Sequence, residues 1–164
     1  MDKYMGKFAG IETGNFSLST RDILLKYKNI AMVGLSPEPS RPSYRAAIHM
    51  KSQGYKIFPV NPNYEEILGL RCYKSLKDIP EPVEIVDIFR KPEDVPPIVE
   101  EAIAIGAKVI WMQLGIINEE AAKRAREAGL EVVMDRCVKI EHCRFFQGLN
   151  LVGLNTGVIT SRKI

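Results

Sequence analysis

Five short apolar runs, separated by stretches with helical spacing, constrain the fold of this chain more than any other feature. The runs are IAMVGL (30–35), YKIFPV (55–60), EIVDIF (84–89), KVIWMQ (108–113) and LEVVM (130–134). IAMVGL shows no alternation of apolar and polar residues, which is typical of a strand buried on both faces of a parallel sheet. Because parallel strands need crossover helices, this order predicts an α/β fold with a doubly wound, mostly parallel sheet of about five strands and helices on both faces.

Local signals delimit the helices between these runs. Helices are expected over residues 21–28, 43–53, 92–105, 118–129 and 138–146. Thr20 is expected to cap the first helix and Asn118 the fourth, because a side-chain oxygen there can accept a free amide of the first turn. Gly54 provides a stop for the second helix. Pro96 and Pro97 fit the third helix only in its first turns, since an interior proline removes a backbone hydrogen bond.

Length, charge and cysteine content indicate one globular domain in a reducing compartment. At 164 residues the chain suits a single domain, which we expect at 20–164, behind a polar and loosely ordered arm at 1–19. The net charge of +3 comes from 23 basic and 20 acidic residues without a basic run, so we expect neither nucleic acid nor membrane as a partner. Three cysteines do not indicate a disulfide framework, and no signal peptide or membrane-spanning run is visible, which favours the cytoplasm.

The loop after the first run, within VGLSPEPSRPSY, has the composition of an anion site. Ligands of an open parallel sheet bind at the carboxyl ends of its strands. Gly34 allows a sharp turn there, and Ser36 offers a hydroxyl and an amide to an oxyanion. Arg41 can supply bidentate donors, while a helix that starts near Ser43 points its free amides into the same crevice. These features predict a pyrophosphate site, and a plain connection stiffened by three prolines is the alternative.

Two features of this region disfavour a nicotinamide dinucleotide. The G-x-G-x-x-G fingerprint is absent, because Pro37 occupies the turn in which the later glycines would stand. The neutral Asn61 directly follows the second run, at a position where an enzyme that binds the ribose of NAD carries Asp or Glu. A phosphate-binding G-K-[ST] loop is also absent, so the sequence offers no visible machinery for ATP hydrolysis.

Five segments together carry a resemblance to a known family. They are VGLSPEPSRPSY, GYKIFPVNP, VDIFRKPEDV, IWMQLGI and DRCVKIEH, in this order and each at the end of a predicted strand. The set closely resembles the stand-alone CoA-binding proteins. Their Rossmann-like domain is similar to the CoA-binding domain of the succinyl-CoA synthetase α subunit and of ADP-forming acyl-CoA synthetases. The resemblance extends from about Thr20 to the C-terminus and includes the NTGVITSRK tail.

The resemblance implies CoA as the ligand and a set of residues that would contact it. These are Gly34, Ser36, Arg41, Ser43, Tyr44, Asn61, Pro62, Phe89, Arg90, Gln113 and Gly115. The pyrophosphate would lie over Ser36 and the start of the next helix, with Arg41 nearby as a cationic partner. Gln113 and Gly115 would line the path of the pantetheine, where an amide and a bare backbone can meet its amide groups.

The same resemblance places the adenosine beside Asn61 and Pro62. A ribose that carries a 3'-phosphate has no use for a carboxylate, which explains the neutral residue at this position. Phe89 and Arg90 would flank either the adenine or the pantetheine, through apolar contact and guanidinium stacking respectively.

Catalytic chemistry is not indicated for this chain by itself. The related synthetases work through a phosphorylated histidine in a later domain, whereas His49 and His142 fall within predicted helices and are expected to be packing or surface residues. Cys137 follows Arg136, precedes Lys139 and begins a predicted helix, features that can lower the pKa of a thiol. A mixed disulfide between Cys137 and the CoA thiol is therefore one hypothesis, and a small buried residue is the alternative. No metal site is expected.

The leading interpretation is a small protein that holds CoA or an acyl-CoA at the carboxyl ends of its strands and is not catalytic by itself. An NAD(P)-binding oxidoreductase or redox sensor with a variant loop is one alternative. The other is the CoA-binding subunit of an acyl-CoA ligase that a second chain completes. Assembly as a homo-oligomer or with a partner subunit stays open.

Overall fold

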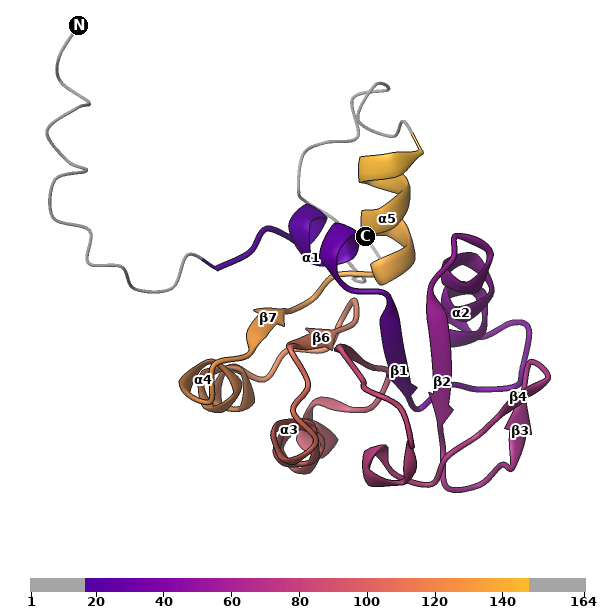
Figure 1. Ribbon diagram of the computed structural model, residues 1–164, viewed down its shortest axis with the longest axis horizontal. Helices are drawn as coiled ribbons and strands as arrows, with labels where there is room; N and C mark the ends of the chain where they lie inside the picture. The colour runs from indigo at the N-terminus through magenta and orange to yellow at the C-terminus, as the bar shows by residue number, and fades with distance from the viewer. Residues whose placement is uncertain (1–16, 148–164) are drawn as a thin grey trace, which may run out of the picture.

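Five parallel strands form the central sheet of the computed structural model, which describes residues 17–147 (Figure 1). The strands are β1 (Asn29–Val33), β2 (Lys56–Val60), β5 (Ile85–Ile88), β6 (Val109–Met112) and β7 (Glu131–Val133). They lie in the order β2-β1-β5-β6-β7, and every neighbouring pair is parallel. Each strand coincides with one of the five apolar runs, except that β1 begins one residue earlier, at Asn29, so the predicted doubly wound sheet is confirmed.

Helices cover both faces of the sheet, as predicted. They are α1 (Thr20–Lys26), α2 (Pro42–Ser52), α3 (Val95–Ala104), α4 (Glu119–Glu127) and α5 (Val138–Phe146). In Figure 1, α1 and α5 lie above the sheet, α2 lies beside β2 at the right, and α3 and α4 lie below the sheet. The buried apolar residues of α1, α2 and α5 belong to one hydrophobic cluster and those of α3 and α4 to the other. Successive side chains of a strand point to opposite faces, so Ile30 and Met32 of β1 pack with the first group while Ala31 packs with the second.

The helix ends follow the predicted signals with one correction. Ser19, and not Thr20, caps α1, because Ser19 has extended backbone angles and its hydroxyl accepts the Asp22 amide at 3.1 Å. Asn118 caps α4 as predicted, by accepting the Ala121 amide at 2.9 Å. The two prolines of α3 stand in its first turn, directly after the short 3-10 turn η3 (Pro92–Asp94).

The connection between β2 and β5 is a small hairpin where a crossover helix would be usual. It comprises β3 (Glu66–Ile67) and β4 (Leu70–Arg71), which are antiparallel, and the 3-10 turn η2 (Leu76–Asp78). An isolated parallel bridge joins Val60 to Tyr73. The hairpin therefore returns the chain to the carboxyl end of β2, and the residues after Tyr73 lie beside that end.

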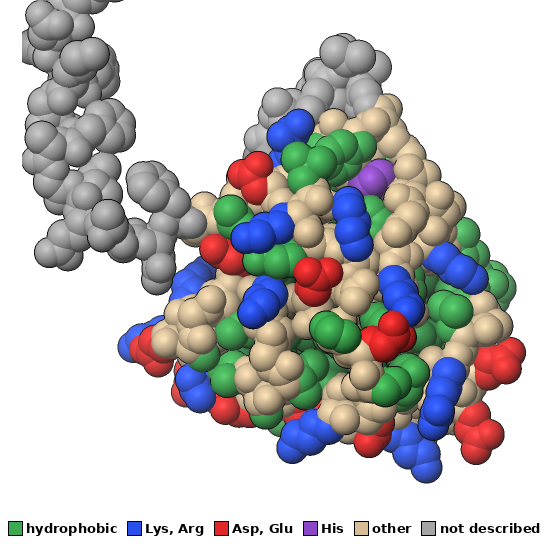
Figure 2. Space-filling view, viewed as in Figure 1, with side chains coloured by type: hydrophobic (Ala, Val, Ile, Leu, Met, Phe, Trp, Pro, Cys, Tyr) green, Lys and Arg blue, Asp and Glu red, His purple; other side chains and the backbone are tan. Residues whose placement is uncertain are grey.

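Several predictions fall on parts of the chain outside the described residues. Residues 1–16 of the predicted arm and the NTGVITSRK tail are among them. Within residues 17–147, no helix is long and apolar enough to cross a bilayer. Basic and acidic side chains are interspersed over the face of the molecule shown in Figure 2.

Candidate functional site

The strand order reverses between β1 and β5, and the carboxyl ends of these two strands meet at Gly34. The chain leaves β1 toward β2 on one side and leaves β5 toward β6 on the other, which is the arrangement that opens a crevice in doubly wound folds. Gly34 has φ of +87°, and its amide donates to the Val60 carbonyl at 2.8 Å. A Cβ at Gly34 would lie 2.7 Å from the Phe89 carbonyl oxygen and 2.8 Å from the Arg90 Cδ. Only glycine fits this position.

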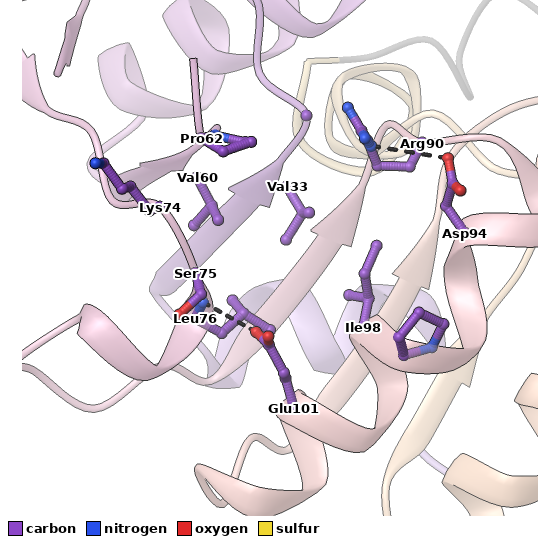
Figure 3. Close-up of a pocket in the computed structure, with 12 residues that line it drawn as sticks. Val33, Val60, Pro62, Lys74, Ser75, Leu76, Arg90, Asp94, Ile98 and Glu101 are labelled. Atoms are coloured by element: carbon purple, nitrogen blue, oxygen red, sulfur yellow. Dashed lines mark hydrogen bonds and ion pairs between the residues drawn. The ribbon is translucent and has the colours of Figure 1, made fainter. Parts of the chain in front are cut away.

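A smaller cavity of about 260 Å³ opens on the α3 side of this point (Figure 3). It is lined by Val33, Gly34, Val60, Pro62, Lys74, Ser75, Leu76, Arg90, Asp94, Pro97, Ile98 and Glu101. Most of its floor is apolar and comes from β1, β2, η2 and α3. Two cationic residues, Lys74 and Arg90, belong to different elements of its rim. The cavity therefore combines an apolar slot with positive charge at its opening.

The polar groups of the smaller cavity differ in the ion pairs and hydrogen bonds that they already form with other residues. Arg90 Nε lies 3.9 Å from Asp94 Oδ2, a long ion pair between two partly exposed side chains. Glu101 Oε2 accepts the Leu76 amide at 3.1 Å. Lys74 forms no hydrogen bond or ion pair with another residue of the described range. The charge on Lys74 is thus available to an anionic ligand.

A larger cavity of about 700 Å³ opens on the side of α2 and α5. It is lined by Gly34, Ser36, Arg41, Pro42, Ser43, Phe89, Arg90, Lys91, Pro92, Gln113, Leu114, Ile116, Cys137 and Ile140. Aliphatic and aromatic side chains form much of its wall, and a few polar groups stand among them. Gly34 and Arg90 line both cavities. The two cavities are therefore neighbouring compartments at one edge of the sheet.

Two polar side chains, Asp87 and Gln113, meet at the wall of the larger cavity. Asp87 is completely buried, its Oδ1 accepts from Gln113 Nε2 at 2.6 Å, and its Oδ2 has no hydrogen-bond partner among the described residues. Burial raises the pKa of Asp87 well above its usual value, against the smaller opposing effect of the Gln113 hydrogen bond. Gln113 lines the cavity, so the Asp87 carboxyl fixes one of its amide hydrogens and leaves its other polar positions for a ligand.

Cys137 lines the same cavity but is not an activated thiol. Burial raises the pKa of Cys137, and a backbone hydrogen bond with Ile140 lowers it by less. Smaller effects come from Asp87, which raises this pKa, and from the backbone and positive charge of Lys139, which lower it. The expectation of a lowered pKa is therefore wrong, because desolvation of the thiolate outweighs the neighbouring cation. All three cysteines, Cys72, Cys137 and Cys143, are free.

The turn from β1 into α2 is organised by its own hydrogen bonds. The Ser36 amide donates to the Ser43 hydroxyl at 3.1 Å, and the Ser36 hydroxyl accepts the Glu38 amide at 3.1 Å. Arg41 Nε donates to Glu38 Oε2 at 3.2 Å, and both side chains are well exposed. An exposed pair of this kind is weak, so Arg41 can exchange Glu38 for an anionic ligand at little cost.

The structure brings most of the predicted contact residues to the two cavities. Gly34, Ser36, Arg41, Ser43, Pro62, Phe89, Arg90 and Gln113 line one or both of them. Three others lie elsewhere. Tyr44 borders a hollow between α2 and α5 together with Lys139. Asn61 is buried and donates to the Leu35 carbonyl at 3.1 Å, and the Gly115 amide donates to Asp135 Oδ1 at 2.7 Å.

Other lining residues were not predicted. Lys74 and Ser75 reach the smaller cavity only because the hairpin folds back beside β2, and nothing in the local pattern marks that return. Glu101 lies in the middle of α3. The prediction considered the loops at the carboxyl ends of the strands, and a residue within a helix is outside these loops. Ile116 could have been found, since it follows the carboxyl end of β6 in the segment IWMQLGI.

The two histidines form a separate cluster away from both cavities. His49 Nε2 of α2 and His142 Nδ1 of α5 lie 3.1 Å apart, and Cys143 Sγ lies 3.6 Å from His49 Nε2. Burial lowers the pKa of both histidines, and Lys139 adds to the effect on His49. Among residues 17–147, no group of three or more His, Cys, Asp or Glu side chains is arranged to hold a metal ion. The pair joins two helices and has no contact with the candidate site.

Comparison with known proteins gives the family. The sequence profile of the family described as "CoA binding domain" matches residues 28–143. "Uncharacterized protein YneT" of Bacillus subtilis is 43% identical over 122 residues, which cover 74% of this chain and 90% of that protein. A solved structure, "hypothetical protein from Pyrococcus horikoshii OT3", has 48% identity and a TM-score of 0.75, with 77% of this chain and 92% of that chain covered.

A longer relative shares the same region. Acetate-CoA ligase (ADP-forming) II of Archaeoglobus fulgidus is 33% identical over 144 residues, which cover 84% of this chain but only 20% of the ligase. The profile match spans all five strands of the sheet and most of α5. This chain therefore belongs to the CoA binding domain family.

Proposed function

We propose that the chain binds one molecule of CoA, or an acyl-CoA, across the two cavities and is not catalytic by itself. The observation that carries the proposal is the meeting of two unlike cavities at Gly34 and Arg90. CoA has a matching division into an adenosine with a 3'-phosphate, a pyrophosphate and a long, weakly polar pantetheine arm. A ligand of this shape would cross the edge of the sheet at Gly34, where the absence of a side chain lets the ligand approach the backbone.

The adenosine would occupy the smaller cavity. Its base would lie on the apolar floor, and Pro62 would border the ribose. Lys74 and Arg90 stand at the rim, where a 3'-phosphate would receive charge-assisted hydrogen bonds. Asn61 would support this site indirectly, since its amide holds the Leu35 carbonyl of the phosphate turn.

The pyrophosphate and pantetheine would follow into the larger cavity. The pyrophosphate would lie at the start of α2, where Ser36 and Arg41 offer donors and the helix presents its positive end. The pantetheine would run along Phe89 and Ile116, with its amide groups within reach of Gln113. Tyr44, in the first turn of α2, and Gly115, in the loop after β6, would then support the shape of the site without lining the cavities.

The limited overlap with the ligase supports a binding role. The chain corresponds to 20% of that relative, and neither histidine of this chain lies at the cavities. Acyl activation would then require groups that neither cavity supplies, which keeps a partner subunit or a homo-oligomer within the proposal. We further propose that residues 20–164 form one domain and that the protein acts in the cytoplasm, where three free cysteines are stable.

Calorimetric titration of the full chain tests the ligand. We expect CoA to bind with a stoichiometry of one per chain and 3'-dephospho-CoA to bind more weakly, since Lys74 and Arg90 would lose an anionic partner. NAD and NADP are expected to bind much more weakly than CoA, because the pyrophosphate turn lacks the glycines of a dinucleotide site. Tight binding of NAD without binding of CoA would overturn the proposal.

A further inference from the structure

Asp135 has an unusual backbone conformation beside the larger cavity. Its φ is +58°, and within residues 17–147 Leu68 is the only other non-glycine residue with a positive φ. The left-handed region is unfavourable for a residue with a Cβ, although Asp and Asn tolerate it better than most. Strain of this kind persists only where the surrounding structure fixes the residue, so the contacts of Asp135 are informative.

The contact that fixes Asp135 is a hydrogen bond to another loop. The Gly115 amide donates to Asp135 Oδ1 at 2.7 Å, a short distance that is typical of a charged acceptor. Gly115 also has a positive φ, of +85°. The bond therefore joins the loop after β6 to the loop between β7 and α5, and both partners hold left-handed conformations.

These two loops form one side of the larger cavity. Leu114 and Ile116, on either side of Gly115, line it, and Cys137 lines it from the loop that contains Asp135. Gly115 and Asp135 are not among the lining residues. The hydrogen bond between them thus lies behind the cavity wall, where it can set the spacing of the two loops without contact with a ligand.

Other hydrogen bonds attach the base of the second loop to β6. Trp111 Nε1, from a completely buried side chain, donates to the Arg136 carbonyl at 2.8 Å. The Arg136 amide donates to the Met112 carbonyl at 3.3 Å. Both partners of Arg136 belong to the strand itself, whereas Asp135 extends the attachment to the loop beyond the strand. This part of the cavity wall is the part that Asp135 holds.

We propose that Asp135 is a positioning residue that holds the two loops at the spacing that the pantetheine arm of CoA requires. The inference rests on the proposed function, in which the larger cavity receives the pantetheine. It adds a residue that acts on the ligand through Gly115. A cavity wall that is ordered before binding raises affinity, because the ligand does not have to order it.

The test compares CoA with adenosine 3'-phosphate 5'-diphosphate, the part of CoA that lacks the pantetheine arm, by calorimetric titration of the full chain. Asp135→Gly removes the acceptor and relieves the backbone strain, whereas Asp135→Ala removes the acceptor and keeps the strain. We expect both variants to bind CoA about 5- to 10-fold more weakly than the wild type. Their affinity for the nucleotide part should be unchanged.

Asp135→Asn is the matched variant. Asn keeps a side-chain oxygen for the Gly115 amide and tolerates the left-handed conformation, so its affinity for CoA should stay within about 3-fold of the wild type. Leu68→Gly relieves the same kind of strain in the hairpin, away from both cavities, and should leave both affinities unchanged.

A measurement on the wild-type chain does not depend on the folding of any variant. The amide hydrogen of Gly115 should exchange slowly with solvent in NMR spectra, because Asp135 holds it. Circular dichroism establishes which variants are folded. If Asp135→Gly and Asp135→Ala are not, the exchange of Gly115 decides the matter, and exchange as fast as that of a free amide would contradict the inference.

Equal affinity for CoA in the wild type and a folded Asp135→Gly variant would overturn the inference. So would a parallel loss for CoA and its nucleotide part, a loss in Asp135→Asn as large as that in Asp135→Gly, or a wild-type chain that binds CoA no more tightly than the nucleotide part. In all these cases CoA binds and only the role of Asp135 is wrong. A wild-type chain that binds neither compound would instead contradict the proposed function, and the inference with it.

Discussion

Gly34 is the residue at which backbone conformation and the candidate site depend on each other most directly. Both Gly34 and Gly54 have positive φ, at +87° and +91°, but only at Gly34 would a Cβ meet other atoms, the nearest at 2.7 Å. Gly54→Ala is expected to cost about 1–2 kcal/mol of unfolding free energy from its backbone conformation alone. Gly34→Ala should cost more and should also weaken CoA binding, because its methyl group displaces Phe89 or Arg90.

Urea denaturation and CoA titration of the two glycine variants check this expectation. Gly54→Ala serves as the control, since it carries the same backbone strain away from the cavities. Equal losses of stability with unchanged CoA affinity in both variants would contradict a close approach at Gly34.

Asp87 gives a prediction about pH. Burial raises its pKa in the folded state above the unfolded value of about 3.9, so the folded chain holds this proton more tightly. Its contribution to stability is therefore complete below the unfolded pKa and is lost as the pH rises toward the folded pKa. Asp87→Asn keeps an acceptor for Gln113 and has no such proton, so its stability relative to the wild type should improve from pH 5 to pH 8.

Urea denaturation at pH 5 and pH 8 measures that difference. Glu127→Gln is a suitable control, because Glu127 is exposed and makes only a 3.9 Å contact with Lys123. Its difference from the wild type should stay constant. A pH-independent difference for Asp87→Asn would show that the carboxyl does not titrate as its burial indicates.

Single residues also show which parts of the site can be predicted from the sequence and which cannot. Gly34, Ser36 and Arg41 could be predicted because they lie in the loop that follows a strand. Ligands of an open parallel sheet bind at the carboxyl ends of its strands, and these ends can be located from the sequence. Glu101 could not be predicted as a lining residue, since its place in the smaller cavity depends on the packing of the middle of α3 over η2. Asn61 was correctly placed at a strand end, yet the structure shows its side chain holding the Leu35 carbonyl of the turn between β1 and α2.

At the scale of elements, the pairing of α2 with α5 is sensitive to acid. Burial lowers the pKa of His49 and His142, so the unfolded chain binds protons more readily than the folded one. The stability from this pair is present above the unfolded pKa of about 6.5 and is lost as the pH falls below it. Lys139, Lys28 and the neutral Cys143 are the groups that face the pair, and the two lysines act in the same direction.

The double variant His49→Gln/His142→Gln tests the acid sensitivity. Asp87 titrates in the opposite sense, so the informative quantity is the difference in unfolding free energy between wild type and variant. That difference should shrink between pH 7.5 and pH 5.5, because only the wild type loses stability through these histidines. A difference that stays constant or grows over this range would contradict the role of the pair.

Elements with strong local signals were predicted well, and the elements of the connection between β2 and β5 were predicted only in part. The five apolar runs and the cap at Asn118 define strands and helices through local periodicity and hydrogen bonding. Each strand of the hairpin at 66–71 has only two residues, and the position of the hairpin beside β2 depends on the bridge between Val60 and Tyr73. The order β2-β1-β5-β6-β7 depends on long-range pairing, which no local pattern specifies.

At the scale of the whole molecule, the candidate site is assembled from the ends of several elements. The smaller cavity takes residues from β1, β2, η2 and α3, and the larger takes residues from the loops before α2 and α5. Only Gly34 and Arg90 line both. The central claim is therefore that one extended ligand, CoA, joins the two cavities across the edge of the sheet.

Native mass spectrometry of the purified full chain, mixed with equal concentrations of CoA and NAD, tests this claim most directly. We expect a species that carries one CoA per chain, with little or no species that carries NAD. A spectrum with bound NAD and no bound CoA would contradict the claim.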